Sequence, residues 1–255
     1  MIRVEQLRKS FNSTAVLRGV DLVVNDGETL VVIGRSGCGK SVLLKHLCAL
    51  LKPDEGRVIV DGTDVVPLSE RALAPIRKKF GVLFQSAALF DSMTVFDNVA
   101  FPLREERKFS ESDIAERVEH ALAIVDLLEA KDKKPAELSG GMRKRAGLAR
   151  ACVAQPEYIL YDEPTTGLDP ILSDNINDLV LRLRNQLKVT SVAVTHDLIS
   201  AYKIADRIAM LHEGRIHMIG TSQEIQATTD QVVRQFVTGM GDPTQEVAGA
   251  ATTEH

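Results

Sequence analysis

The sequence has few cysteines, no long apolar run and no strong excess of either charge, and each shortage excludes a class of protein. Its 255 residues include three cysteines, whose spacing fits no metal site and whose odd number suits a reducing cytoplasm. No apolar run approaches the roughly 20 residues that span a bilayer, and the first residues lack the apolar core of a secretory signal. The net charge of −4 argues against a broad nucleic-acid surface. We therefore expect a soluble globular protein with no nucleic-acid partner.

Short apolar strands alternate with helical patterns, which predicts an α/β fold with a mostly parallel sheet. Leu30–Ile33 is apolar throughout, as in a strand that is buried on both faces. The other expected strands are near 2–7, 20–24, 57–60, 158–161, 191–195 and 208–211. The expected helices are near 40–51, 111–129, 139–154 and 170–186.

The middle of the chain has the periodicity of helices, and the last residues have small or polar side chains. We interpret residues of about 86–157 as a helical subdomain that is inserted into the α/β core of a single domain, 1–240. Residues 241–255 form a tail that we expect to be flexible unless a partner binds it.

A glycine-rich segment follows the apolar strand and precedes a helix. It reads Gly34-Arg35-Ser36-Gly37-Cys38-Gly39-Lys40-Ser41, which is the pattern of a phosphate-binding loop. Its glycines let several main-chain N–H groups point at phosphate oxygens, and the helix start adds partial positive charge. Lys40 can reach the outer phosphates, and the Ser41 hydroxyl can bind Mg²⁺. A glycine-rich turn without a ligand is the simpler alternative, which this context disfavours.

Polar residues also follow two later strands. Asp162 and Glu163 end the strand near 158–161, at the sheet edge where α/β proteins bind ligands. Asp162 is predicted to hold Mg²⁺, directly or through water, and Glu163 to act as the general base on an attacking water. His196 ends the next strand, where it can contact the terminal phosphate. The alternatives are a surface acidic pair before a turn and a structural histidine.

A third motif, Leu138-Ser139-Gly140-Gly141-Met142, lies between the other two. With all three in this order, the chain resembles the ATP-binding-cassette (ABC) ATPases, the nucleotide-binding subunits of ABC transporters, from about Val4 to Gly220. This resemblance implies a P-loop fold with an N-terminal antiparallel β subdomain. It also implies a homodimer that encloses ATP between the glycine loop of one subunit and the Ser139 motif of the other.

The resemblance assigns further site residues. Ser139, Gly140 and Gly141 would contact the partner's nucleotide, which agrees with the attraction of helix starts for anions. Phe11 would stack on adenine, with a plain core aromatic as the alternative. Gln85 would bind Mg²⁺ and water and link them to the permease, and Asp169 would lie in a loop that crosses the dimer. The apolar loop after Gln85 would line the groove for a permease helix.

The sequences of several segments are similar to those of the Mla-type subfamily, whose ATPases drive lipid movement between inner and outer membranes. The family's usual glutamine is replaced by Met142, and basic residues follow it. Leu89–Val95 and Val233–Gly239 also resemble this group. The resemblance implies a subunit peripheral to the cytoplasmic face of the inner membrane, with a transmembrane permease, a lipid-binding MCE protein and a small STAS-domain subunit as partners.

Three other functions share part of this pattern with a lipid transporter. A polar-solute importer would share every nucleotide motif. A non-transport ABC ATPase that acts on DNA is disfavoured because no heptad repeat interrupts the chain between Ser41 and Leu138, and one that acts on ribosomes usually has two cassettes. A small-molecule kinase would explain the glycine loop but neither Ser139-Gly140-Gly141 nor Glu163.

Overall fold

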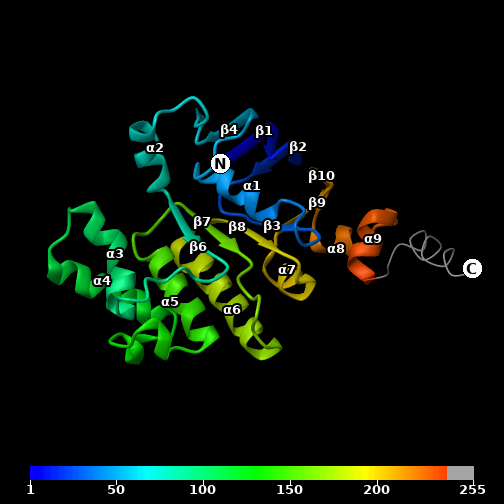
Figure 1. The fold of residues 1–255 in the computed structure, drawn as a ribbon. Coiled ribbons are helices and arrows are strands. Elements are labelled where there is room, and N and C mark those ends of the chain that lie inside the picture. The colour runs from blue at the N-terminus through cyan, green and yellow to red at the C-terminus, as the bar shows by residue number, and fades with distance from the viewer. Residues whose placement is uncertain (240–255) are drawn as a thin grey trace, which may run out of the picture.

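The computed structural model describes residues 1–239. Its strands form two sheets, one antiparallel and one mostly parallel (Figure 1). The first sheet is antiparallel, in the order β2-β1-β4-β5, with bounds Thr14–Val24, Ile2–Phe11, Glu55–Val60 and Thr63–Asp64. The second has the order β10-β9-β3-β8-β7-β6, with bounds Arg215–Gly220, Arg207–His212, Thr29–Ile33, Thr190–Thr195, Tyr158–Asp162 and Phe80–Leu83. All its pairs are parallel except β9 with β10. The predicted fold class is therefore confirmed.

The helices surround these sheets. They are α1 Lys40–Leu47, α2 Glu70–Arg77, α3 Val95–Glu106, α4 Glu111–Ile124, α5 Gly140–Cys152, α6 Pro170–Leu187, α7 Leu198–Ile204, α8 Ser222–Ala227 and α9 Gln231–Thr238. Two short 3₁₀ turns, Leu128–Ala130 and Pro135–Glu137, precede α5. Figure 1 shows the antiparallel sheet on one side of the larger sheet and α5 and α6 on the other.

The side chains of each central strand point alternately to the two faces of the sheet, and this divides the core into two halves. Leu30 and Val32 of β3 pack with the antiparallel sheet and α1, whereas Val31 and Ile33 pack with α3, α5 and α6. Successive side chains of a strand point to opposite faces, so a strand between two apolar layers must be apolar at every position. The continuous run in the sequence thus reflects burial on both faces, as expected.

The register of the central strands brings their carboxyl ends together. Ile33 of β3 lies opposite Thr195 of β8, and Asp162 of β7 lies opposite Val194. The residues that follow these three strands therefore emerge at one edge of the sheet. This edge is where the sequence places the glycine loop, the acidic pair and His196.

Two predicted helices are shorter than expected, and five helices, α2, α3, α7, α8 and α9, were not predicted. Helix α1 stops at Leu47 rather than near residue 51 because Ala49 adopts a left-handed conformation, with φ of 54°. Helix α4 stops at Ile124 rather than near 129 because Asp126 does the same. Helices α2 and α3 each contain an interior proline, which weakens a helical pattern in sequence.

Three helices, α3 to α5, lie between β6 and β7, where the sequence places the inserted helical subdomain of about 86–157. The predicted tail, 241–255, lies outside the described residues. Within residues 1–239, no helix has both the length and the apolar character needed to cross a bilayer.

Strand β6 and helix α5 approach each other closely at Gly81. A Cβ at this position would lie 2.0 Å from the carbonyl oxygen of Ala151, an atom that cannot move without its helix. We expect Gly81→Ala to lower the free energy of unfolding by about 1–3 kcal/mol, measured by urea or thermal unfolding. The matched control is Gly220→Ala, where the new Cβ would meet the flexible end of Glu224 at 2.9 Å. An equal or larger loss in the control would contradict this account.

Candidate active site

The glycine loop begins where β3 ends and closes into the first turn of α1. Gly37 and Gly39 have φ of 77° and 106°, a region that residues with a Cβ rarely occupy. A Cβ on Gly39 would also lie 2.9 Å from Cγ1 of Val16. Both constraints explain why glycine is required at these positions of the loop.

Lys40 extends back from α1 over this loop. Its ammonium donates to the carbonyl oxygens of Gly34 at 2.9 Å and Arg35 at 3.2 Å. It also lies 3.5 Å from Oε1 of Glu163, and both side chains are less than a tenth exposed. Buried charges are costly unless they are paired, so this cluster holds positive and negative groups in balance.

Glu163 is the most highly connected acid of the site. Its Oε2 atom accepts hydrogen bonds from Nδ1 of His196 at 2.9 Å, from the hydroxyl of Thr166 at 3.0 Å and from that of Thr195 at 3.3 Å. Burial acts to raise the pKa of Glu163, but the hydrogen bonds from His196 and Thr166 and the charges of His196 and Lys40 outweigh it and hold the pKa below its ordinary value. Glu163 is therefore a carboxylate at neutral pH.

Asp162 and Ser41 are directly joined. The Ser41 hydroxyl donates to Oδ1 of Asp162 at 2.7 Å, across the gap between the start of α1 and the end of β7. The pair presents a hydroxyl and a carboxylate at one point, which is the oxygen donor set that hard divalent cations prefer.

These elements enclose a cavity of about 310 Å³. Eight predicted site residues line it: Ser36, Gly37, Gly39, Lys40, Ser41, Gln85, Glu163 and His196. Val16, which the sequence did not single out, contributes an apolar wall. Cys38 lies half-buried in the same loop, and burial raises the pKa of its thiol against the opposing charge of Lys40.

The remaining predicted residues are not among those that line this cavity. Ser139 and Gly141 line a separate cavity of about 410 Å³ beside Leu172, and Gly140 lies next to Leu168. Ser139 caps α5 by accepting from the N–H of Met142, and Asp169 caps α6 in the same way from Leu172. Phe11 is 43% exposed at the end of β1, which does not fit the plain core aromatic considered as the alternative.

Lys144 is the residue that the sequence analysis missed. It lies on α5, is 5% exposed, and donates to the carbonyl oxygens of Gln85 at 2.7 Å and Glu163 at 2.9 Å. Burial lowers its pKa to about 8, opposed by the charges of Asp162 and Glu163. A signal was present, because Lys144 shares a helix face with Gly147 and Leu148, which are small or apolar core residues.

Comparison with known proteins gives a consistent set of relatives. A family model described as ABC transporter matches residues 17–166. The probable ribonucleotide transport ATP-binding protein mkl of Mycobacterium tuberculosis is 45% identical over 238 residues, which are 93% of this chain and 66% of that protein. The chain thus spans 66% to 69% of the length of the mycobacterial relatives.

Two further relatives are named for different cargoes. The intermembrane phospholipid transport system ATP-binding protein MlaF of Haemophilus influenzae is 39% identical, over 95% of this chain and 92% of that protein. The methionine import ATP-binding protein MetN 1 of Rhodopseudomonas palustris is 40% identical, over 94% and 65%. Among solved structures, the dimeric post-hydrolysis state of the ATP-binding cassette MJ0796 with ADP and phosphate has a TM-score of 0.81 and 31% identity, over 87% of this chain and 99% of that one.

The hydrogen bond from His196 predicts a change in the acidity of Glu163. His196→Ala removes the donor that lowers the pKa of Glu163 most, so this pKa should rise because burial is then less opposed. Carbon-detected NMR titration of the carboxyl group measures this directly. Thr166→Val removes a second donor and should raise the pKa less. A pKa that is unchanged in His196→Ala would contradict the assigned contact.

Proposed function

Since this chain belongs to the ABC transporter family, we propose that it hydrolyses ATP as the motor subunit of a membrane transporter. The observation that supports this most strongly is the meeting of the glycine loop, Gln85, Glu163 and His196 around one cavity. Phosphoryl transfer to water needs positioning and charge stabilisation more than covalent chemistry, and this cavity offers both.

The residues of the cavity fit a nucleoside triphosphate with Mg²⁺. The open space beside Gly37 and the buried ammonium of Lys40 suit phosphate oxygens, which would compete for the donors that Lys40 now gives to loop carbonyls. Ser41, Asp162 and Gln85 would hold the Mg²⁺, which would neutralise negative charge on the phosphates when bound.

Glu163 is the proposed general base. Its lowered pKa keeps it ionised at neutral pH, so it is ready to accept a proton from a water molecule that faces the terminal phosphate. His196 holds Oε2 of this carboxylate and is itself half exposed to the cavity, from where it can reach the phosphate. The two side chains thus orient the water and its target together.

The proposal includes a homodimer that shares each nucleotide site. Ser139 and Gly141 do not line the cavity of their own chain, yet Ser139 starts α5 with a cap that suits an anion. We propose that this motif completes the cavity of a second copy, with Asp169 in the loop between them. The solved dimer of the cassette MJ0796 supports this arrangement.

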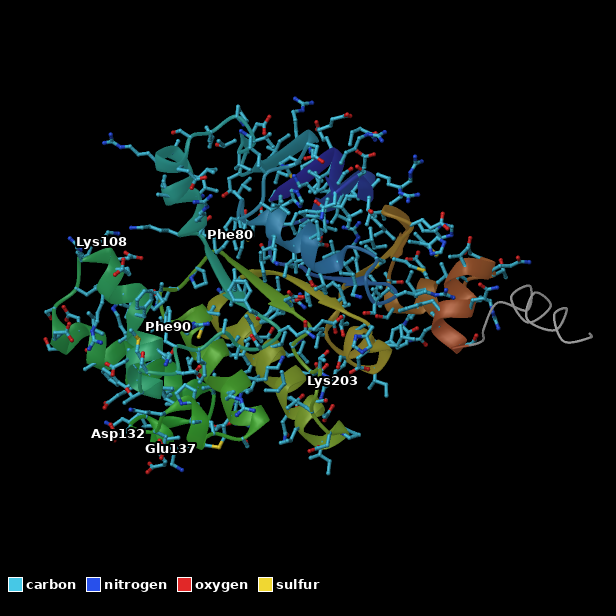
Figure 2. The ribbon with its side chains drawn as sticks, in the orientation of Figure 1. Phe80, Phe90, Lys108, Asp132, Glu137 and Lys203 are labelled. Atoms are coloured by element: carbon cyan, nitrogen blue, oxygen red, sulfur yellow. The ribbon has the colours of Figure 1, made fainter. Side chains whose placement is uncertain are left out.

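An apolar groove supports a permease partner. A cavity of about 390 Å³ lies between β6 and the helices α3 and α5, and its walls include Phe80, Phe84, Phe90 and Phe101. Figure 2 labels Phe80 beside β6 and Phe90 toward the helical side. Arg77 and Arg150 add positive charge at its lining. We propose that a short helix of the transmembrane permease binds here, which would place this chain on the cytoplasmic face of the inner membrane.

For the cargo, we propose phospholipid that moves between the inner and outer membranes. The match to MlaF and the presence of Met142 in the Ser139 motif support this assignment. The same resemblance extends the proposed complex to a lipid-binding MCE protein and a small STAS-domain subunit. The match to MetN 1 supports a polar-solute importer as the second candidate.

If two copies share each nucleotide site, a variant that binds ATP but does not hydrolyse it should remain a dimer. This outcome depends on Glu163 and Ser139. Glu163→Gln should keep ATP binding, lower hydrolysis by about 10²-fold or more, and shift to a dimer in gel filtration with ATP. Adding Ser139→Arg should leave ATP binding by the isolated chain intact but abolish the dimer, because a bulky cation then occupies the helix start. Hydrolysis at the parent rate in Glu163→Gln, or an unchanged dimer in the double variant, would contradict the proposal.

The cargo assignment predicts which molecules co-purify with the chain from membranes. A tagged chain that is purified from detergent-solubilised membranes should bring a multi-span permease and phospholipid, and phospholipid should stimulate its ATP hydrolysis. Phe90→Asp is the matched control, since it places a charge in the groove and should lose the permease without loss of ATP binding. Stimulation by methionine instead of phospholipid would favour the second candidate.

A further inference from the structure

One face of α5 holds the main chain of the loop that contains Gln85. The face consists of Lys144, Gly147 and Arg150, which are spaced by three residues and so lie along one side of the helix. Lys144 donates to the carbonyl oxygen of Gln85, and Arg150 donates to those of Ala87 at 2.6 Å and Ala88 at 2.7 Å. The helix therefore holds three residues of the loop 84–94 by their carbonyl oxygens.

Gly147 makes this contact close. A Cβ on Gly147 would lie 2.7 Å from Cδ1 of Leu83 and 3.1 Å from the Cβ of Ala87. Ala87 and Ala88 have φ of 62° and 46°, a left-handed conformation that is costly for alanine and persists only where surrounding contacts impose it. The loop is thus held in a defined shape by α5 rather than by its own preference.

Lys144 differs from Arg150 because it also reaches the catalytic segment. Its ammonium bridges two carbonyl oxygens, one from Gln85 and one from Glu163, which belong to different parts of the chain. A lysine in the core is expensive unless its donors are used, and an apolar residue of similar length would fit the same space. Its presence there needs a reason beyond packing.

We propose that Lys144 is a positioning residue that ties α5 to the main chain of Glu163, the proposed base, and to that of Gln85 in the same subunit. This inference rests on the proposed shared site, in which Ser139 contacts the nucleotide of the partner subunit. Ser139 caps the helix whose second turn contains Lys144, about 7 Å along the axis, so a helix that moves as a unit displaces both. Contact of Ser139 with the partner's nucleotide is thereby transmitted to Glu163, the proposed base that acts on the nucleotide of its own subunit.

The first test separates chemistry from binding. Lys144→Met removes the ammonium but keeps the chain length, and it should lower kcat of ATP hydrolysis by about 10-fold or more with KM changed by less than about threefold. Lys144→Arg keeps a cation with several donors and should recover most of the parent kcat. Full activity in Lys144→Met, or no recovery in Lys144→Arg, would overturn the proposal.

The matched control lies next to Lys144 on the same helix. Arg145 donates to the carbonyl oxygen of Val125, in the helical part of the molecule and away from the catalytic strand. Arg145→Met therefore also removes one cation and its main-chain bond, but it should leave kcat within about twofold of the parent. An equal fall of kcat in both variants would mean that Lys144 only stabilises α5, and the proposal would be wrong.

A second experiment keeps this inference distinct from the proposed function. In the Glu163→Gln background, adding Lys144→Met should leave the ATP-driven dimer intact in gel filtration, whereas adding Ser139→Arg should abolish it. If Glu163→Gln forms no dimer, the proposed function fails. If the dimer forms but is lost on adding Lys144→Met, or if Lys144→Met alone has parent kcat, only the positioning role fails. Lys144→Gln replaces Lys144→Met in both assays if the latter does not fold, with an intermediate kcat expected.

Discussion

The site depends on the pairing of charges that are buried where the parallel sheet ends. Lys40 and Glu163 are both nearly covered and lie 3.5 Å apart, so the loss of either would remove an opposite charge that stabilises the other. Their other partners come from separate segments: loop carbonyls after β3 for Lys40, and Thr166 and His196 for Glu163. Because these segments follow strands whose register is fixed, correct strand pairing and charge pairing require each other. A slip of one residue would separate the charges and turn the core side chains to the wrong face.

The two halves of the apolar core hold that register. Alternate side chains of β3, β7 and β8 are buried in opposite directions, one set against α1 and the antiparallel sheet and the other against α5 and α6. Neither half alone would hold a strand that is apolar at every position. Helix α5 therefore has two functions at once, since it covers one face of the sheet and it extends Lys144 and Arg150 to the loop that contains Gln85. Packing and site geometry are linked through this helix.

The central strands, four of the nine helices in residues 1–239 and eight of the residues that line the cavity could be predicted, because the relevant patterns are local. A continuous apolar strand followed by a glycine loop specifies both the burial of β3 and the position of Lys40. The end of α1 could not be predicted, since alanine gives no signal for the left-handed conformation that Ala49 adopts. Aspartate adopts this conformation more readily, so Asp126 could have marked the end of α4. Lys144 was missed for a different reason. A basic residue between Arg143 and Arg145 suggests a solvated face, and this pattern outweighed the small and apolar residues Gly147 and Leu148 that share its side of the helix.

The helix starts give a physical reason why nucleotide would join two copies. Of the α-helices in residues 1–239, α1 and α5 begin with neither an acidic cap nor an acidic residue in the first turn, whereas the other seven have one or the other. Their partial positive charges are thus left free for an anion. In the proposed dimer these two starts face each other across one cavity, together with Lys40, and would repel without a triphosphate between them. Cleavage of the terminal phosphate splits the anion whose negative charge offsets the partial positive charges of both helix starts. In the proposed dimer, the same chemistry that consumes the nucleotide therefore also weakens the contact between subunits.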